Sequence, residues 1–141
     1  MLSKYEKELI ATIWERVALR AEDVGAEALL RMFTCFPKTK TYFDQKDLSP
    51  RSPHLLSHGG RIVEAIAEGA KNIDTLATTL APLSVLHAYQ LRIDPTNFKL
   101  LCHCILVTLS CRMAEEFTPV VHAAIDKFLS ALSAVLTEKY R

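Results

Sequence analysis

Two histidines lie among apolar residues at helical spacing, a position from which an imidazole either completes a core or binds a metal or ligand. His58 and His87 are flanked three or four residues away by Leu55, Ile62, Leu83 and Leu91. Residues at this spacing share one face of a helix, so each imidazole is expected to point toward a core. A buried histidine is also common as a hydrogen-bonded structural residue, and the spacing alone leaves that alternative open.

The rest of the sequence supplies the apolar slot that a haem group would require. The candidate walls are Phe43, Ile62, Leu83, Leu86, Leu91, Ile93, Phe98 and Leu101. A large apolar pocket with few polar groups suits a flat cofactor, and neutral imidazole is a suitable axial ligand for haem iron. Spacing and polarity do not by themselves demonstrate a porphyrin. Because no Cys-x-x-Cys-His run is present, any haem is expected to be bound non-covalently.

The elements that must position these histidines are expected to be helices. Four glycines and six prolines interrupt the chain, and the apolar residues recur every three or four positions. We expect an all-α protein with helices over about 3–19, 22–36, 54–73, 82–89, 95–113 and 119–138. Ser3 with Glu6 is expected to form a capping box, and Asp74 to cap the element that follows it. The polar stretch 43–53, with two prolines, is expected to be irregular.

Composition indicates a soluble protein with a single domain over residues 1–141. The chain is 50% hydrophobic and 23% charged, and its formal net charge of +1 gives no reason to expect nucleic acid binding. Apolar stretches such as 100–109 are too short to span a membrane. The N-terminus becomes charged at once, unlike a secretory signal, so we expect a cytoplasmic protein.

The four cysteines, Cys35, Cys102, Cys104 and Cys111, are too few for a disulfide scaffold in a chain with this much core-forming material. We expect buried or partly buried reduced thiols. Cys102 and Cys104 are two residues apart, so on a helix they point to different faces and cannot share a tetrahedral metal ion.

Several sequence runs resemble those of vertebrate haemoglobin α-type chains, members of the globin family. The runs are Phe-Pro-x-Thr-Lys-Thr-Tyr-Phe (36–43), Ser-His-Gly (57–59), Leu-His-Ala (86–88), Leu-Arg-Ile-Asp-Pro-Thr-Asn-Phe-Lys-Leu-Leu (91–101), Glu-Phe-Thr-Pro (116–119), Asp-Lys-Phe-Leu (126–129) and Glu-Lys-Tyr-Arg (138–141). The resemblance covers the whole chain. It implies the globin fold of about seven to eight helices around a pocket for non-covalent haem b with its iron. It also implies reversible oxygen transport rather than enzymatic activity, in an α2β2 heterotetramer with β-type chains in the red blood cell cytoplasm.

The resemblance assigns roles to individual residues. His87 would be the proximal iron ligand and His58 the distal residue that donates a hydrogen bond to oxygen, with CO and NO as further ligands. The implied haem pocket consists of Leu29, Met32, Tyr42, Phe43, Gln45, Arg61, Ile62, Leu83, Leu86, Leu91, Ile93, Asn97, Phe98, Leu101 and Leu136. The implied subunit interfaces consist of Arg31, Lys38, Lys40, Thr41, Arg92, Asp94, Pro95, Cys104, Val107, Phe117, Pro119, His122, Asp126, Tyr140 and Arg141.

Some positions depart from the common α-type pattern. Asp44, Gln45 and Lys46 replace a usual Pro-His-Phe, which removes the loop histidine that contacts a haem propionate. Gln45, Lys46 and Arg61 are the alternative partners for that carboxylate. Ile62 replaces a common valine beside the ligand, and Lys38 replaces a threonine at the sliding contact. Leu2 after Met1 resembles minor α-type chains such as α-D, which indicates a minor, embryonic or larval role.

Two other functions are compatible with a helical chain that carries these histidines. A redox or peroxide-acting haem enzyme would need a distal arrangement that promotes O–O cleavage, or a reductase partner, and neither is visible in the sequence. A haem-free helical interaction protein is disfavoured because Phe43, His58 and His87 are all present.

Overall fold

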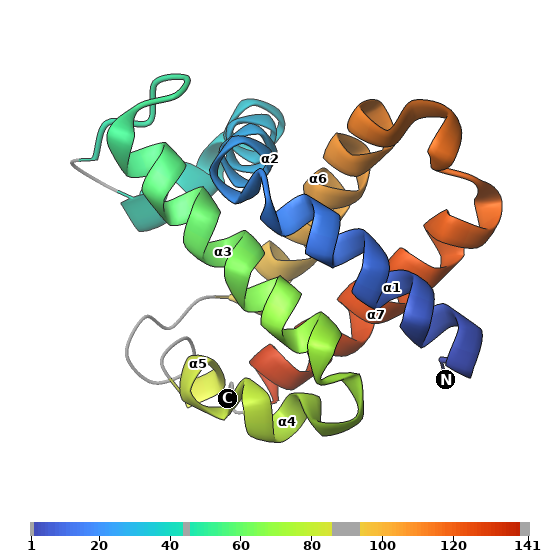
Figure 1. Cartoon of the computed structure of the whole chain (residues 1–141). Coiled ribbons are helices and arrows are strands. Elements are labelled where there is room, and N and C mark those ends of the chain that lie inside the picture. Colours follow the sequence, from blue (N-terminus) through green and yellow to red (C-terminus); the bar gives the residue numbers. More distant parts are fainter. Residues whose placement is uncertain (1, 44–45, 86–93, 139–141) are drawn as a thin grey trace.

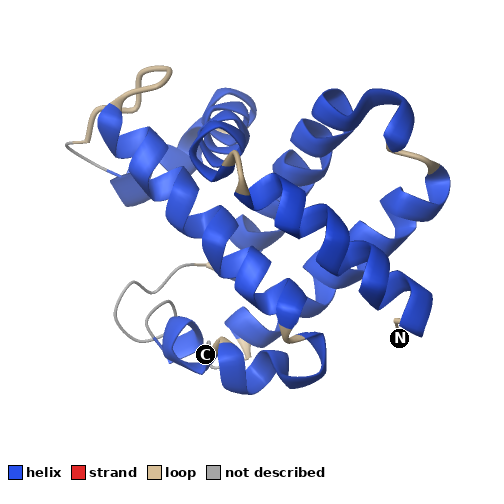
Figure 2. Cartoon of the chain, viewed as in Figure 1, coloured by secondary structure: helices blue, strands red, loops and turns tan. Residues whose placement is uncertain are grey.

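The computed structural model describes residues 2–43, 46–85 and 94–138, and every regular element in these ranges is helical (Figure 2). The α-helices are α1 (Lys4–Ala18), α2 (Ala21–Cys35), α3 (Pro53–Lys71), α4 (Leu76–Thr79), α5 (Ala81–Val85), α6 (Pro95–Met113) and α7 (Pro119–Thr137). Shorter 3-10 helices are η1 (Pro37–Phe43), η2 (Ile73–Thr75) and η4 (Ala114–Glu116). The all-α prediction is therefore confirmed.

The long helices begin at the local signals that the sequence carries. The Ser3 hydroxyl accepts the Glu6 backbone N–H at 3.1 Å, while the Glu6 carboxylate accepts the Ser3 N–H at 2.9 Å. This reciprocal pair is the predicted capping box, and it satisfies two N–H groups that an isolated helix end leaves without partners. α6 and α7 begin at Pro95 and Pro119, as predicted, since proline at a first-turn position loses no helical hydrogen bond.

The segment between α3 and α5 differs from the prediction. Asp74 caps no helix, because it lies inside η2 and its carboxylate instead pairs with Lys7 at 2.6 Å. α4 was not predicted at all, and it begins after Thr75 without a side-chain cap. α3 ends at Lys71 rather than near residue 73. The predicted 82–89 helix begins at Ala81, and the part of it beyond Val85 lies outside the described residues.

The helices enclose two neighbouring apolar clusters. α3, green in Figure 1, packs on α1, α2 and α7, while α6 packs on α2 and α7. The larger cluster lies among α1, α2, α3, α4, α6 and α7, and it includes Trp14 and Phe128, whose ring centroids are 6.3 Å apart. The smaller cluster lies between α2, the start of α3 and Cys104 of α6. The two clusters meet at Ile62 and Leu101, which pack against both.

A close crossing of α2 and α3 sets the position of His58. A Cβ atom on Gly25 would come within 2.0 Å of the Gly59 carbonyl oxygen, and a Cβ on Gly59 within 2.4 Å of the Ala26 nitrogen. Both distances are far below van der Waals contact, so the two backbones approach this closely only because neither position carries a side chain. His58 immediately precedes Gly59, so this close crossing fixes the position of His58 relative to α2.

α7 is long and apolar enough to cross a membrane, and among the described residues it alone meets that criterion. The prediction from sequence considered shorter stretches and overlooked it. Its apolar face is nevertheless committed to the core, with Ala124, Ile125, Phe128 and Leu129 all buried. One face of α7 therefore contributes to the core of this fold, with seven of its residues buried against other helices.

Candidate functional site

Phe43 and His58 come together from different elements. Phe43 ends η1 and His58 lies in the second turn of α3, and their ring centroids are 5.1 Å apart in an edge-to-face arrangement. Phe43 also packs edge-on against Phe33 of α2, at 5.2 Å between centroids. Edge-to-face contacts of this kind favour one relative orientation of the rings. The fold thus places the predicted distal histidine beside the predicted stacking phenylalanine.

His54 is a member of this cluster that the sequence analysis missed. Its ring is nearly parallel to that of His58, with 5.9 Å between centroids and an interplanar angle of 11°, and it lies 6.3 Å from Phe43. The His54 Nε2 atom is buried and has no hydrogen-bond partner among the described residues. The spacing of four residues between His54 and His58 is the signal that could have identified the pair.

Several predicted pocket side chains pack against one or both clusters but remain only half-buried. They are Phe43 of η1, Ile62 of α3, Leu83 of α5, and Phe98 and Leu101 of α6. Ile62 and Leu101 pack against both clusters. Large apolar side chains that four elements leave half-buried fit an apolar, flat group such as a porphyrin, which would cover them.

A hydrogen-bonded link joins η1 to the start of α6. The Tyr42 hydroxyl accepts the Asn97 side-chain amide at 3.0 Å and the Asp94 backbone N–H at 3.3 Å. The Asp94 carboxylate in turn caps α6 by accepting the Thr96 N–H at 2.9 Å. Tyr42 and Asn97 were both predicted to line the pocket, and the structure brings them into direct contact.

The other predicted pocket residues fall into three groups. Leu29, Met32 and Leu136 are buried, the first two in the smaller cluster and the third in the larger one. Arg61 and Lys46 are exposed, as a partner for a solvent-facing carboxylate would be. The remaining predicted residues, Gln45, Leu86, His87, Leu91 and Ile93, lie outside the described residues. Their roles, including iron ligation by His87, stay predictions.

Most of the residues predicted at subunit interfaces lie on the surface. Those that are exposed are Lys38, Lys40, Thr41, Asp94, Pro119, His122 and Asp126, and those partly buried are Arg31, Pro95, Val107 and Phe117. Cys104 is buried, with a relative exposure of 2%. Phe117 packs against His122 at 5.4 Å between ring centroids. Asp44, Arg92, Tyr140 and Arg141 lie outside the described residues.

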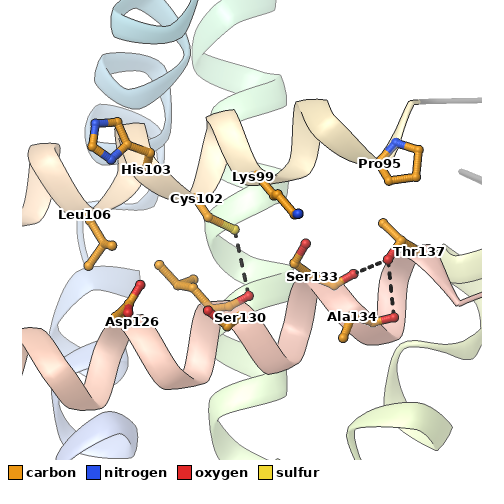
Figure 3. Close-up of a pocket in the computed structure, with 11 residues that line it drawn as sticks. Pro95, Lys99, Cys102, His103, Leu106, Asp126, Ser130, Ser133, Ala134 and Thr137 are labelled. Atoms are coloured by element: carbon orange, nitrogen blue, oxygen red, sulfur yellow. Dashed lines mark hydrogen bonds between the residues drawn. The ribbon is translucent and has the colours of Figure 1, made fainter.

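A groove of about 470 Å³ lies between α6 and α7 (Figure 3), and His58 is not among the residues that line it. Its lining includes Lys99 and His103 from α6 and Asp126 and Ser133 from α7. None of the predicted haem-pocket residues lines it, whereas Pro95 and Asp126 belong to the predicted subunit interfaces. The groove is therefore separate from the candidate pocket.

Comparison with known proteins identifies the family. The sequence profile of the globin family matches residues 26–136. The chain is 53% identical to hemoglobin subunit alpha-D of Phasianus colchicus colchicus over 141 residues, with 100% of both chains covered. It is 54% identical to hemoglobin subunit pi of Gallus gallus and 51% identical to hemoglobin subunit zeta of Equus caballus, with 99% of each chain covered. These matches confirm the resemblance inferred from the motifs. The chain belongs to the globin family.

Proposed function

We propose that this globin is an α-type haemoglobin subunit that transports oxygen reversibly on a non-covalent haem b. The observation that carries the proposal is the meeting of Phe43 and His58, together with the half-buried apolar side chains that pack against one or both clusters. The haem, when bound, supplies the ferrous iron to which O2, CO and NO bind. The protein acts as a carrier and not as an enzyme.

Different residues of the chain would have different roles in the haem pocket. His87 is the proposed proximal ligand to iron. His58 would donate an imidazole N–H to an oxygen molecule that has gained partial negative charge, and this hydrogen bond favours oxygen over less polar ligands. Phe43 would stack on the porphyrin, while the half-buried apolar side chains exclude water. Lys46 and Arg61 are exposed and available to the propionates.

Assembly with other subunits is the second part of the proposal. We infer that the chain is a single globin domain over residues 1–141 and pairs with β-type chains in an α2β2 heterotetramer. The residues named above for subunit contacts would form its interfaces. The exposed residues Lys38, Lys40 and Thr41, together with the corner at Asp94 and Pro95, would lie at the sliding contact between αβ dimers. The site of action would be the red blood cell cytoplasm, without a nucleic acid or membrane partner.

Oxygen equilibrium curves test this function directly. The haem-loaded chain is measured alone and after mixing with a β-type chain, each at two pH values. Sigmoidal binding in the mixture and reversible binding by the chain alone are expected, since switching between two quaternary states requires the tetramer. A hyperbolic curve in the mixture would count against a switching tetramer, and absence of a Soret band in native protein would establish a haem-free role.

Replacing His58 with leucine is expected to speed oxygen release by about ten- to hundredfold, the effect of losing a hydrogen bond worth ~1.5–3 kcal/mol to a charged acceptor. Autoxidation is also expected to accelerate, because the imidazole no longer excludes water and protons from that side of the pocket. Stopped-flow release of oxygen measures the first effect. His54→Leu is the matched control one helical turn earlier. An equal acceleration of oxygen release in that variant would show that His54 and His58 together, rather than His58 alone, retain the bound oxygen.

Replacing Ile62 with valine is expected to accelerate ligand association. The change removes one methylene beside the ligand, which limits the effect to less than about fourfold because a methylene contributes ~0.8 kcal/mol. Flash photolysis of the CO complex measures the rate. Ile66→Val removes the same methylene one turn later, at a buried core position, and should leave association unchanged. Equal rates for Ile62→Val and the unmodified chain would show that Ile62 does not limit ligand access.

A further inference from the structure

Two polar contacts fix the register between α2 and α6. Arg112 Nε donates to Glu27 Oε1 at 3.0 Å, and Arg31 donates to the Thr108 hydroxyl at 2.6 Å. From the first pair to the second, the position advances by four residues along α2 and retreats by four along α6. The two helices are therefore antiparallel, with one turn of each facing one turn of the other. The next turn on each helix carries a cysteine.

This register places Cys35, the last residue of α2, opposite Cys104 of α6. The Thr108 hydroxyl donates to the Cys104 carbonyl at 2.8 Å, so the residue that anchors Arg31 is itself tied to the turn that carries Cys104. Burial raises the pKa of the Cys104 thiol, and so does the neighbouring Cys35 thiol, while Arg31 acts in the opposite direction. The electrostatic influence of Cys35 on Cys104 agrees with the placement that the helix register gives.

The two thiols differ in access to solvent. Cys35 is exposed, as is Cys111, which corrects the expectation that the cysteines are buried or partly buried. Cys104 is buried, with 2% exposure. An exposed thiol can react with a small molecule in solution. A buried thiol beside it reacts with a sulfur already attached to the neighbour, since that step requires no access to solvent. This combination is the arrangement of an attacking and a resolving cysteine.

The remaining cysteines are placed differently. Burial raises the pKa of the Cys102 thiol to about 12, and its sulfur is directed to the Leu129 carbonyl of α7 at 3.8 Å (Figure 3). Cys102 is therefore held as an unreactive neutral thiol. Cys111 is exposed but follows Thr108 on α6 by three residues, away from the end of α2. Neither shares the turn that faces Cys35.

We propose that, in the chain before it assembles with β-type chains, Cys35 and Cys104 form a thiol–disulfide exchange site that reacts with small disulfides such as oxidised glutathione. The Cys35 thiolate attacks one sulfur of the small disulfide, forming a mixed disulfide and releasing one thiol. Cys104 then loses its proton and attacks the Cys35 sulfur, forming the Cys35–Cys104 bond and releasing the second thiol. The small disulfide is reduced to two thiols, and the protein loses two hydrogens.

The test uses the folded full-length chain with haem bound, before any β-type chain is added, because Cys104 belongs to the predicted subunit interface. Oxidised glutathione is added, free thiols are blocked with an alkylating agent, and peptide mass spectrometry locates the bonds. A Cys35–Cys104 linked peptide is the expected result. In Cys104→Ser the mixed disulfide at Cys35 is expected to persist at least about tenfold longer, because a held neighbour resolves it faster than a free thiol does.

Two controls keep the assignment specific. Cys111→Ser should form the same linked peptide at an unchanged rate. In denaturant the linkage should shift to bonds among Cys102, Cys104 and Cys111, since closing a loop of few residues costs less entropy than joining Cys35 to a distant thiol. A mixed disulfide at Cys35 that persists equally in the unmodified chain and in Cys104→Ser would overturn the proposal, as would a Cys35–Cys111 bond. The readout is independent of oxygen binding, so it succeeds or fails separately from the proposed function.

Discussion

Replacing Gly25 with alanine is expected to destabilise the fold by more than about 3 kcal/mol, beyond the usual cost of overpacking, because the new methyl group meets backbone rather than a flexible side chain. The added Cβ would lie 2.0 Å from the Gly59 carbonyl oxygen and 2.2 Å from its carbon. Helix α3 would have to move away from α2, taking His58 with it. Urea unfolding of the haem-loaded chain measures the change in free energy.

Gly69→Ala is the matched control for that substitution. Gly69 also lies within a helix, but a Cβ there meets the ends of side chains, Leu76 Cδ2 at 3.1 Å and Leu132 Cδ1 at 3.5 Å. These atoms can shift, and alanine improves helix propensity by ~1 kcal/mol. The expected change in unfolding free energy is therefore under about 1 kcal/mol. Equal destabilisation by the two substitutions would mean that the close crossing has no special role.

Replacing His87 with glycine is expected to cause the largest loss of function. Removing even a residue that supports a metal ligand typically costs ten- to hundredfold in affinity, so loss of the ligand itself should accelerate haem loss by at least about a hundredfold. Transfer of haem to an excess of an apo-acceptor protein, followed in the Soret region, measures that rate. Added imidazole should restore retention, because it can enter the space left by the missing ring and bind iron.

The control for this substitution is His103→Gly, which removes an exposed histidine from α6. Its rate of haem loss should match that of the unmodified chain. If His87→Gly lost haem no faster than His103→Gly, His87 would not be the iron ligand. Another residue would then have to bind the iron.

The sequence predicts those features that are encoded locally. The starts of α1, α6 and α7 depend on a serine with a glutamate three residues later, or on proline at a first-turn position, and each signal lies within a few residues of the boundary it sets. Asp74 resembled such a signal but failed, because Lys7 on a distant helix binds its carboxylate instead. A contact between elements far apart in the sequence overrode a local preference.

At the candidate site, too, the sequence predicts individual residues but not the contacts between distant elements. His58 could be identified from a motif, but its stacking with His54 and its contact with Phe43 depend on how η1 and α3 pack. The Gly25–Gly59 crossing likewise joins two helices through the absence of side chains, and an absence produces no periodic pattern in the sequence. Cys35 and Cys104 are 69 positions apart, and only the register between α2 and α6 makes them neighbours.

The bond network around Tyr42 has a mechanical consequence. A single phenol joins the segment that ends in Phe43 to the helix that carries Phe98. Moving either stretch without the other would stretch the hydrogen bonds that Tyr42 makes to Asp94 and Asn97. A shift of Phe43 would therefore be felt at the first turn of α6, and a partner that displaces the exposed residues Lys38, Lys40 and Thr41 would act on the pocket by the same route.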